Sequence, residues 1–315
     1  MGGFSMTVIP PAPRGFTKPA LSVDDQLELL EGRGLQISDR EEAKHCLHHI
    51  GYYRLSGYFL PFQKGGRGPD RHEFLKGTDF KDALDRYVFD RKLRLLVLDA
   101  TERIEVAFRA SLSNSIAIKH GPNWYQDSKL FNLSRHFNHA KFIQHIKEQI
   151  SHDSKDAKKR DVFINHYYLN YDTPDMPPCW MVFEAVSFGS ISIAFKNMDK
   201  RECNDICDKF GLKHQFLSSW IHCISYIRNV CAHHSRLWNR VCTIKPLIDK
   251  KYRDDLEVNN KVYAQLAVIQ IILKQVSPDN HWAERLKKLM SEHPNVPLKQ
   301  MGMPADWSER EIWKA

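Results

Sequence analysis

One stretch of the chain, residues 225–240, concentrates side chains that can perform acid–base chemistry on a phosphate diester. Its candidate site residues are Arg228, Asn229, His233, His234, Arg236 and Arg240. Neutral imidazole can take a proton from a ribose 2′-hydroxyl, imidazolium can protonate a leaving oxygen, and guanidinium binds phosphate oxygens through paired donors. These groups suffice to cleave RNA through its own 2′-hydroxyl, without a protein nucleophile, a metal or a cofactor.

Apolar residues at helical intervals lead into this stretch and predict that it lies on a single helix. They are Phe216, Leu217, Trp220, Ile221, Ile224 and Ile227. At about 100° per residue, the polar residues from Asn229 to Arg240 fall in one stripe, whereas Arg228 continues the apolar line. Arg228 and His233 then converge only if the arginine side chain curls across or a second helix completes the site. A symmetric dimer would supply such a helix.

A structural interpretation of the same residues is also open. His233 and His234 could cap the end of a core helix, and Arg228 could form a buried ion pair. Glu184 is the only acid in the apolar segment 179–187. Burying an unpaired carboxylate destabilises the folded protein by several kcal/mol. Glu184 is therefore expected either at an exposed edge or beside a cation, for which Arg228 is one candidate.

The composition indicates a soluble globular protein with one large or two small domains. The chain has 315 residues, 42% of them hydrophobic, and a net charge of +8, which favours a polyanionic partner. No apolar stretch has the length or flanks of a leader or a membrane span, so a cytoplasmic protein is expected. The seven scattered cysteines indicate reduced thiols, and their spacing matches no zinc module, so no metal is expected.

Capping and breaking residues predict a chain that is nearly all helix. Ser22 should cap a helix over residues 23–32, and Ser38 with Glu41 should open a second helix that stops at Gly51. A continuous helix is expected over residues 78–120. Its charged residues, from Asp90 to Glu105, are expected on a solvated face, although one or two of them could orient a site. Further helices are expected over residues 135–151, 179–187, 190–197, 199–210, 259–276 and 282–292.

The aromatic stretch 52–62 is too irregular to predict as a helix. One interpretation is a packed aromatic connection. The other is that Tyr52, Tyr53 and Arg54 offer RNA stacking faces and a phosphate donor, as single-strand binders do.

The expected organisation is a flexible lead over residues 1–17, a helical and aromatic region over 18–77, a helical domain over 78–293 and a C-terminal arm over 294–315. Trp307 and Trp313 should anchor that arm.

The run from Arg228 to His233, Arg-Asn-Val-Cys-Ala-His, is similar to the signature of HEPN ribonucleases: arginine, polar residue, three residues, histidine. Its extension to Arg240 resembles the Abi-like (AbiD/AbiF) abortive-infection family. Three other stretches resemble that family too: residues 18–62, 89–94 and 180–189.

The resemblance implies an all-α protein with a HEPN-like helical bundle core, an N-terminal helical extension and a homodimer that builds a composite site. It also implies an RNA-cleaving toxin of anti-phage defence, in some systems restrained by a small partner RNA. Arg228 and His233 would then be the catalytic pair and Asn229 the residue that orients them, while His234 offers a second candidate base.

Two alternatives to an endoribonuclease stay open. A non-catalytic RNA-binding or sensor module could use the same arginines to hold a partner RNA, and its binding would weaken with salt. A dimeric helical adaptor for a phage protein would show no affinity for RNA.

Overall fold

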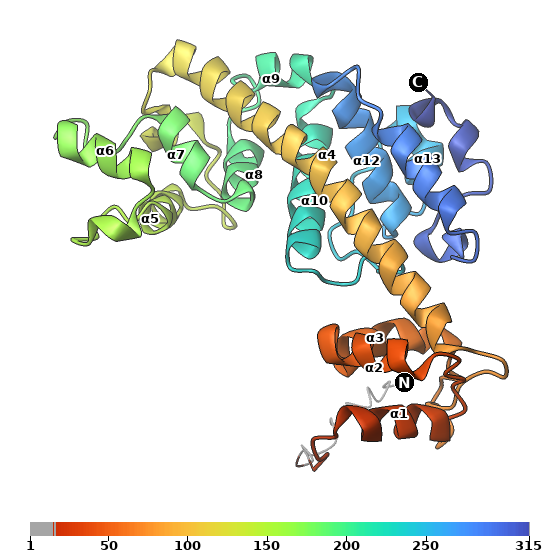
Figure 1. The fold of residues 1–315 in the computed structure, drawn as a ribbon. Coiled ribbons are helices and arrows are strands. Elements are labelled where there is room, and N and C mark those ends of the chain that lie inside the picture. Colours follow the sequence, from red (N-terminus) through yellow and green to blue (C-terminus); the bar gives the residue numbers. More distant parts are fainter. Residues whose placement is uncertain (1–14, 16, 315) are drawn as a thin grey trace, which may run out of the picture. The chain divides into compact units, whose positions relative to one another are not determined.

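The computed structural model describes residues 15 and 17–314. Within these residues it contains thirteen α-helices, short 3₁₀ turns and isolated β-bridges, but no β-sheet (Figure 1). The prediction of an all-α protein is confirmed, whereas most of the predicted lead over residues 1–17 lies outside the described residues. No helix in the described part of the chain is both long enough and apolar enough to cross a bilayer.

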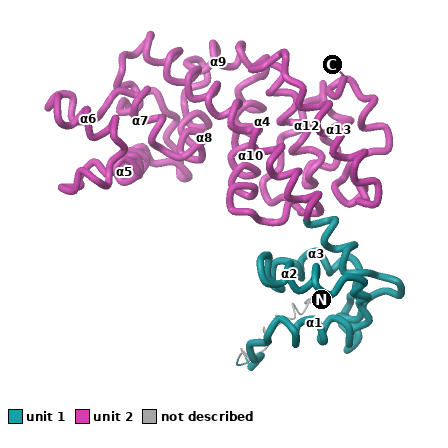
Figure 2. The backbone as a smooth tube through the Cα atoms, in the orientation of Figure 1, with its two compact units in different colours: residues 1–87 teal, residues 88–315 magenta. Residues whose placement is uncertain are grey.

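The chain divides into two compact units, residues 1–87 and 88–315 (Figure 2), and the boundary falls inside the helix α4. The first unit contains α1 (Val23–Gly32), α2 (Arg40–His49), α3 (Tyr52–Phe59) and the first turns of α4 (Phe80–His120). Its core is made of leucine and aromatic side chains from these helices, including Leu27, Leu30, Leu47, Leu55, Phe59 and Phe80.

Two predictions for the first unit hold and two are corrected. Ser22 caps α1 in a capping box with Asp25, and the bounds of α1 match the prediction. Asp39, not Ser38, caps α2 by accepting from the backbone N–H of Glu42 at 2.8 Å, because Ser38 donates instead to the Asp79 carboxylate. The aromatic stretch 52–62 is helical, since α3 continues directly into a 3₁₀ turn over residues 60–62.

Helix α4 is one unbroken helix of 41 residues, as predicted, and most of it belongs to the second unit. It is followed by nine further α-helices: α5 (His139–Gln149), α6 (Val162–Asn170), α7 (Cys179–Ala185), α8 (Phe188–Asn197), α9 (Asn204–Lys209), α10 (His214–Ala232), α11 (Arg253–Leu256), α12 (Val262–Val276) and α13 (Trp282–Glu292). The helices predicted over 135–151 and 199–210 are shorter in the structure. Asn138 caps α5, so the chain before it stays non-helical.

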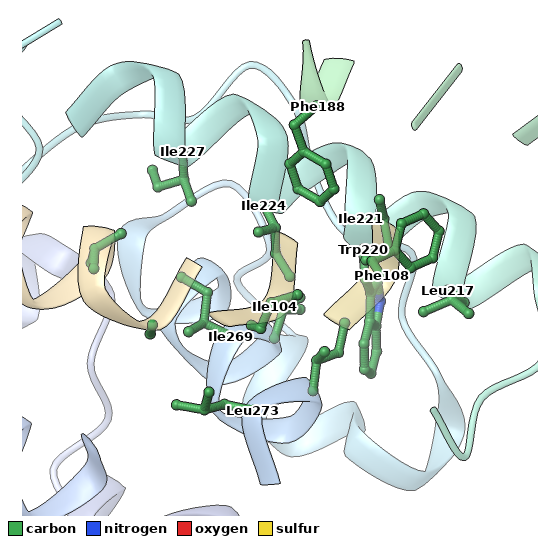
Figure 3. Packing of buried hydrophobic residues seen from close by; sticks show 14 of the residues in the cluster. Ile104, Phe108, Phe188, Leu217, Trp220, Ile221, Ile224, Ile227, Ile269 and Leu273 are labelled. Carbon is green, nitrogen blue, oxygen red and sulfur yellow. The ribbon is translucent and has the colours of Figure 1, made fainter. Parts of the chain in front are cut away.

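Helix α10 is buried along most of its length in the core of this unit. It packs against α8 and α12, and the side chains of α4 enter the same cluster (Figure 3). The labelled residues of that cluster are Ile104, Phe108, Phe188, Leu217, Trp220, Ile221, Ile224, Ile227, Ile269 and Leu273. The C-terminal residues pack onto the same unit, where Trp313 is buried and stacks on Trp282, and Trp307 is buried beside it. The apolar stripe predicted for α10 therefore fixes the position of the polar residues at its end.

Candidate functional site

Helix α10 ends at Ala232 in a backbone motif that normally carries glycine. The N–H of Ser235 donates to the carbonyl of Val230 and the N–H of His234 to that of Cys231, both at 3.0 Å. These two bonds make a Schellman motif. His234 takes its left-handed position with a φ of 55°, which non-glycine residues rarely adopt. The two histidines thus follow the helix at a sharp reversal of the chain, and both are exposed.

The helix end corrects the prediction of a single helix through Arg240. Arg236 and Arg240 lie beyond the reversal, so the stripe they were expected to share with Asn229 and His233 does not form. The two arginines instead belong to an irregular loop, in which Arg240 Nε donates to the carbonyl of Arg236 at 2.9 Å.

A buried carboxylate on α4 holds this loop in place. Asp90 Oδ1 accepts from the backbone N–H of Leu237 at 3.1 Å and from that of Trp238 at 2.6 Å. Asp90 is fully buried and paired with Arg94, one helical turn further on. The prediction that these charges lie on a solvated face is therefore wrong for Asp90 and Arg94.

Arg228 lies at the side of α10 and contacts a second acid of α4. Its Nε is 3.5 Å from Glu105 Oε2, and one of its terminal nitrogens donates to Asn229 Oδ1 at 3.2 Å. The Arg228 side chain is 41% exposed, while that of Glu105 is 11% exposed. Arg228 is therefore held from its buried side and open on the other. Glu184 is exposed, which is one of the two positions expected for it.

Arg109 connects this pair to helix α7. It is buried and paired with Glu105, and it donates to the carbonyls of Phe183 and Val186 at the end of α7, the latter at 3.0 Å. Because Glu105 contacts both Arg109 and Arg228, the orientation of Arg228 depends on side chains from α4 and carbonyls from α7. A buried charge network of this kind restricts side-chain geometry when its members are satisfied.

A pocket of about 590 Å³ opens beside Arg228, between α4, the α7–α8 junction and α10. Its charged lining residues are Glu102, Glu105, Glu184, Arg109 and Arg228. Three carboxylates against two guanidinium groups make this lining acidic overall, so the pocket is a poor binding site for phosphate. The side chains suited to phosphate lie on the exposed face from residue 228 to residue 240.

The structure brings some of the predicted site residues together and separates others. Asn229, His233 and His234 are exposed at the same end of α10, and Arg228 contacts Asn229 there. Within one chain the contacts of Arg228 go to Asn229 and Glu105 rather than to His233. Tyr53 and Arg54 lie on α3 in the other unit, where Tyr53 is 93% exposed.

The motif's cysteine does not add a nucleophile. Burial raises the pKa of Cys231 to about 12, so its thiol stays protonated at neutral pH. In the described residues, no three histidine, cysteine or acidic side chains are grouped so as to hold a metal ion.

Sequence reasoning allowed that one or two charges between Asp90 and Glu105 orient a site, but it did not identify Asp90, Glu105 and Arg109 as the buried ones. A signal was present, because Asp90–Arg94 and Glu105–Arg109 are acid–arginine pairs spaced i, i+4. Such pairs are common on solvated helix faces, so their spacing alone does not distinguish a buried network from a surface one.

Fold and site together define an all-helical protein with an exposed arginine–asparagine–histidine cluster at the end of a core helix. A family model described as Abi-like protein matches residues 45–239, more than half of the chain, so the chain belongs to the Abi-like family. The matched range contains Arg228, His233 and the three positioning residues from α4. Family membership points to involvement in abortive infection. No curated protein and no solved structure matches the chain.

Proposed function

We propose that this protein is a metal-independent endoribonuclease toxin of the HEPN type, acting in a bacterial abortive-infection system. The observation that carries the proposal is the end of α10, where Arg228 is anchored by the buried Glu105 and two exposed histidines follow within six residues. The chain's net charge of +8 also favours a polyanionic substrate.

In the proposed reaction an RNA 2′-hydroxyl attacks the adjacent phosphorus, and a neutral imidazole takes its proton. The bond from phosphorus to the 5′-oxygen breaks, and an imidazolium protonates that oxygen. The products are a 2′,3′-cyclic phosphate and a 5′-hydroxyl end. Arg228 stabilises the charge that develops on the phosphate oxygens, and His233 or His234 serves as the base.

Glu105 acts in this proposal as a positioning residue for Arg228. The guanidinium of Arg228 keeps its exposed side available because Glu105 and Asn229 occupy the other side. Arg236 and Arg240, in the loop held by Asp90, provide further cations for the RNA backbone. Because the pocket beside Arg228 is acidic, the RNA strand is expected to run along the exposed face instead.

The proposal includes a homodimer whose site is shared between two copies. The contacts of Arg228 with Asn229 and Glu105, rather than with His233, support it. Two copies of the α10 end brought together by a twofold axis would place Arg228 of one chain beside a histidine of the other.

A non-catalytic RNA-binding or sensor module that holds a small partner RNA is the second candidate. The pairing of Arg228 with Glu105 favours this second candidate, because an arginine whose charge is partly neutralised stabilises the negative charge of a transition state less. In that case binding would survive loss of the imidazole.

The test is incubation of purified protein with tRNA and with total RNA in EDTA, followed by analysis of the new ends. Wild-type protein should cut RNA and leave cyclic phosphates. Arg228→Ala should lower the cleavage rate by about a hundredfold or more, and so should the alanine variant of whichever histidine is the base, His233→Ala or His234→Ala.

Matched controls come from exposed residues of the same unit, Arg91→Ala and His136→Ala, which should cleave like wild type. The endoribonuclease proposal is wrong if wild-type protein leaves the RNA intact, or if the site variants and the control variants cleave it equally. Retained RNA binding without cleavage would favour the second candidate.

A further inference from the structure

The first unit contains a second pocket, whose lining residues are far from the α10 site along the chain. Its volume is about 580 Å³, and it is formed by α1, by α3 and by the segments around residues 18 and 72. This pocket lies wholly inside the first unit, so its shape is independent of how the two units are arranged.

Aromatic side chains from the start of α3 form one part of this pocket. Tyr52 and Tyr53 both line it, and Tyr53 is 93% exposed. The Tyr52 hydroxyl accepts from Arg33 at 3.1 Å, which fixes that ring beside the cation. An exposed tyrosine ring at the rim of a pocket offers a face on which a planar base can stack.

The charged groups in the lining are all cationic or capable of becoming so. Lys18, Arg33 and His72 line the pocket, and among the residues that the structure describes no aspartate or glutamate does. Burial, followed by the positive charges of Arg71, Arg33 and Lys18, lowers the pKa of His72. The smaller part of that shift, which comes from the three cations, would be relieved by a bound anion.

Neutral hydrogen-bonding groups complete the lining. Gln26, Ser56 and Gln63 also line the pocket, with Gln26 Nε2 donating to the carbonyl of Leu21 at 3.0 Å and the Ser56 hydroxyl to that of Tyr53 at 2.7 Å. Amides both donate and accept, so they can match the edge of a nucleobase. Arg54, predicted from the sequence as a phosphate donor, does not line the pocket; Arg33 does.

We propose that this pocket binds a nucleotide, with the base stacked on Tyr53 and the phosphate held by Lys18, Arg33 and His72. The nucleotide is either a free mononucleotide or one residue of an RNA strand. The acidic pocket beside Arg228 has the opposite charge balance, which argues that the two pockets have different ligands. This proposal does not require the protein to cleave RNA.

The test uses the full-length protein and two kinds of probe. The first is the set AMP, GMP, CMP and UMP, followed by calorimetry. The second is a fluorescein-labelled 2′-O-methyl hexauridylate, followed by anisotropy. This oligomer lacks the 2′-hydroxyl, so the proposed ribonuclease reaction cannot consume it and its binding is read separately from cleavage.

Tyr53→Ser should weaken binding by about fivefold or more, because base stacking on an aromatic ring is lost. Lys18→Gln should weaken binding of the oligomer and lower the slope of log K against log salt by about 0.7, as expected for one lost phosphate contact on a single strand. Both side chains are exposed, so neither change should disturb the fold.

Leu75→Ser and Lys76→Gln are the matched controls, since both residues are exposed in the same unit and neither lines the pocket. Binding of mononucleotides supports a free nucleotide as ligand, and binding of the oligomer alone supports a strand. The proposal is overturned if neither probe binds, or if Tyr53→Ser and Lys18→Gln bind like the controls. Inorganic phosphate that binds as tightly as UMP would overturn it too.

Discussion

His234 holds a conformation that its residue type disfavours. A left-handed backbone is destabilised by about 1–2 kcal/mol for a residue with a Cβ, and glycine avoids that penalty. His234 nevertheless occupies the glycine position of the motif that ends α10, with a φ of 55°. Strain of this kind is concentrated at functional sites, which agrees with a role for the imidazole.

His234→Gly is therefore expected to stabilise the protein while removing the imidazole. Relief of the left-handed strain exceeds the added flexibility of glycine in the unfolded chain, for a net gain of about 0.5–1 kcal/mol. Denaturant unfolding of the variant measures that gain.

His234→Ala is the matched control, because it removes the same side chain and keeps the strain. It should not share the gain, and equal stability of the two variants would show that the backbone is not strained. Cleavage by the same two variants decides between the histidines: if His233 is the base, both retain activity, and if His234 is the base, both lose it.

At the scale of elements, α4 determines where the end of α10 and its loop lie. Asp90 accepts backbone N–H groups of Leu237 and Trp238, while Glu105 contacts Arg228. The same helix thus fixes both the loop that follows the motif and the arginine inside it. Residues that touch no substrate should consequently affect the site.

Asp90→Ala is expected to lower the free energy of unfolding by about 3–5 kcal/mol. The change removes the carboxylate that is paired with the buried Arg94 and deprives two backbone N–H groups of their acceptor. Urea unfolding followed by circular dichroism measures the loss.

Asp99→Ala provides the comparison for this prediction. Asp99 lies on the same helix and pairs with Arg103 and Arg285, but its side chain is 34% exposed. A partly solvated pair contributes about 1 kcal/mol or less. If both variants lose the same amount, the pair formed by Asp90 is not the buried anchor described above.

The parts of the fold and of the candidate site that could be predicted from the sequence are those whose sequence signal is local. The bounds of α1 followed from its capping residue and those of α13 from apolar periodicity, and both signals act within a few residues. The end of α10 did not, because a histidine stands where glycine would have marked the stop. The network of Glu105 and Arg109 was equally hidden, since its partners at Phe183, Val186 and Arg228 are distant in the chain.

At the scale of the whole molecule, the proposed shared site has a consequence for mixtures of inactive variants. If His233 is the base, Arg228→Ala lacks the arginine and His233→Ala lacks the histidine, so a homodimer of either should be inactive. In a mixed dimer, one of the two sites receives an intact arginine from one chain and an intact histidine from the other.

Equal amounts of the two purified variants, mixed and left to exchange subunits, should therefore regain cleavage. About half of the dimers become mixed and each has one intact site of two, so the activity should approach about a quarter of wild type. A double variant, Arg228→Ala with His233→Ala, mixed with either single variant should regain none. Tags on the two chains verify that mixed dimers form. If they form and the mixture stays inactive, Arg228 and His233 act within one chain and the shared site is wrong.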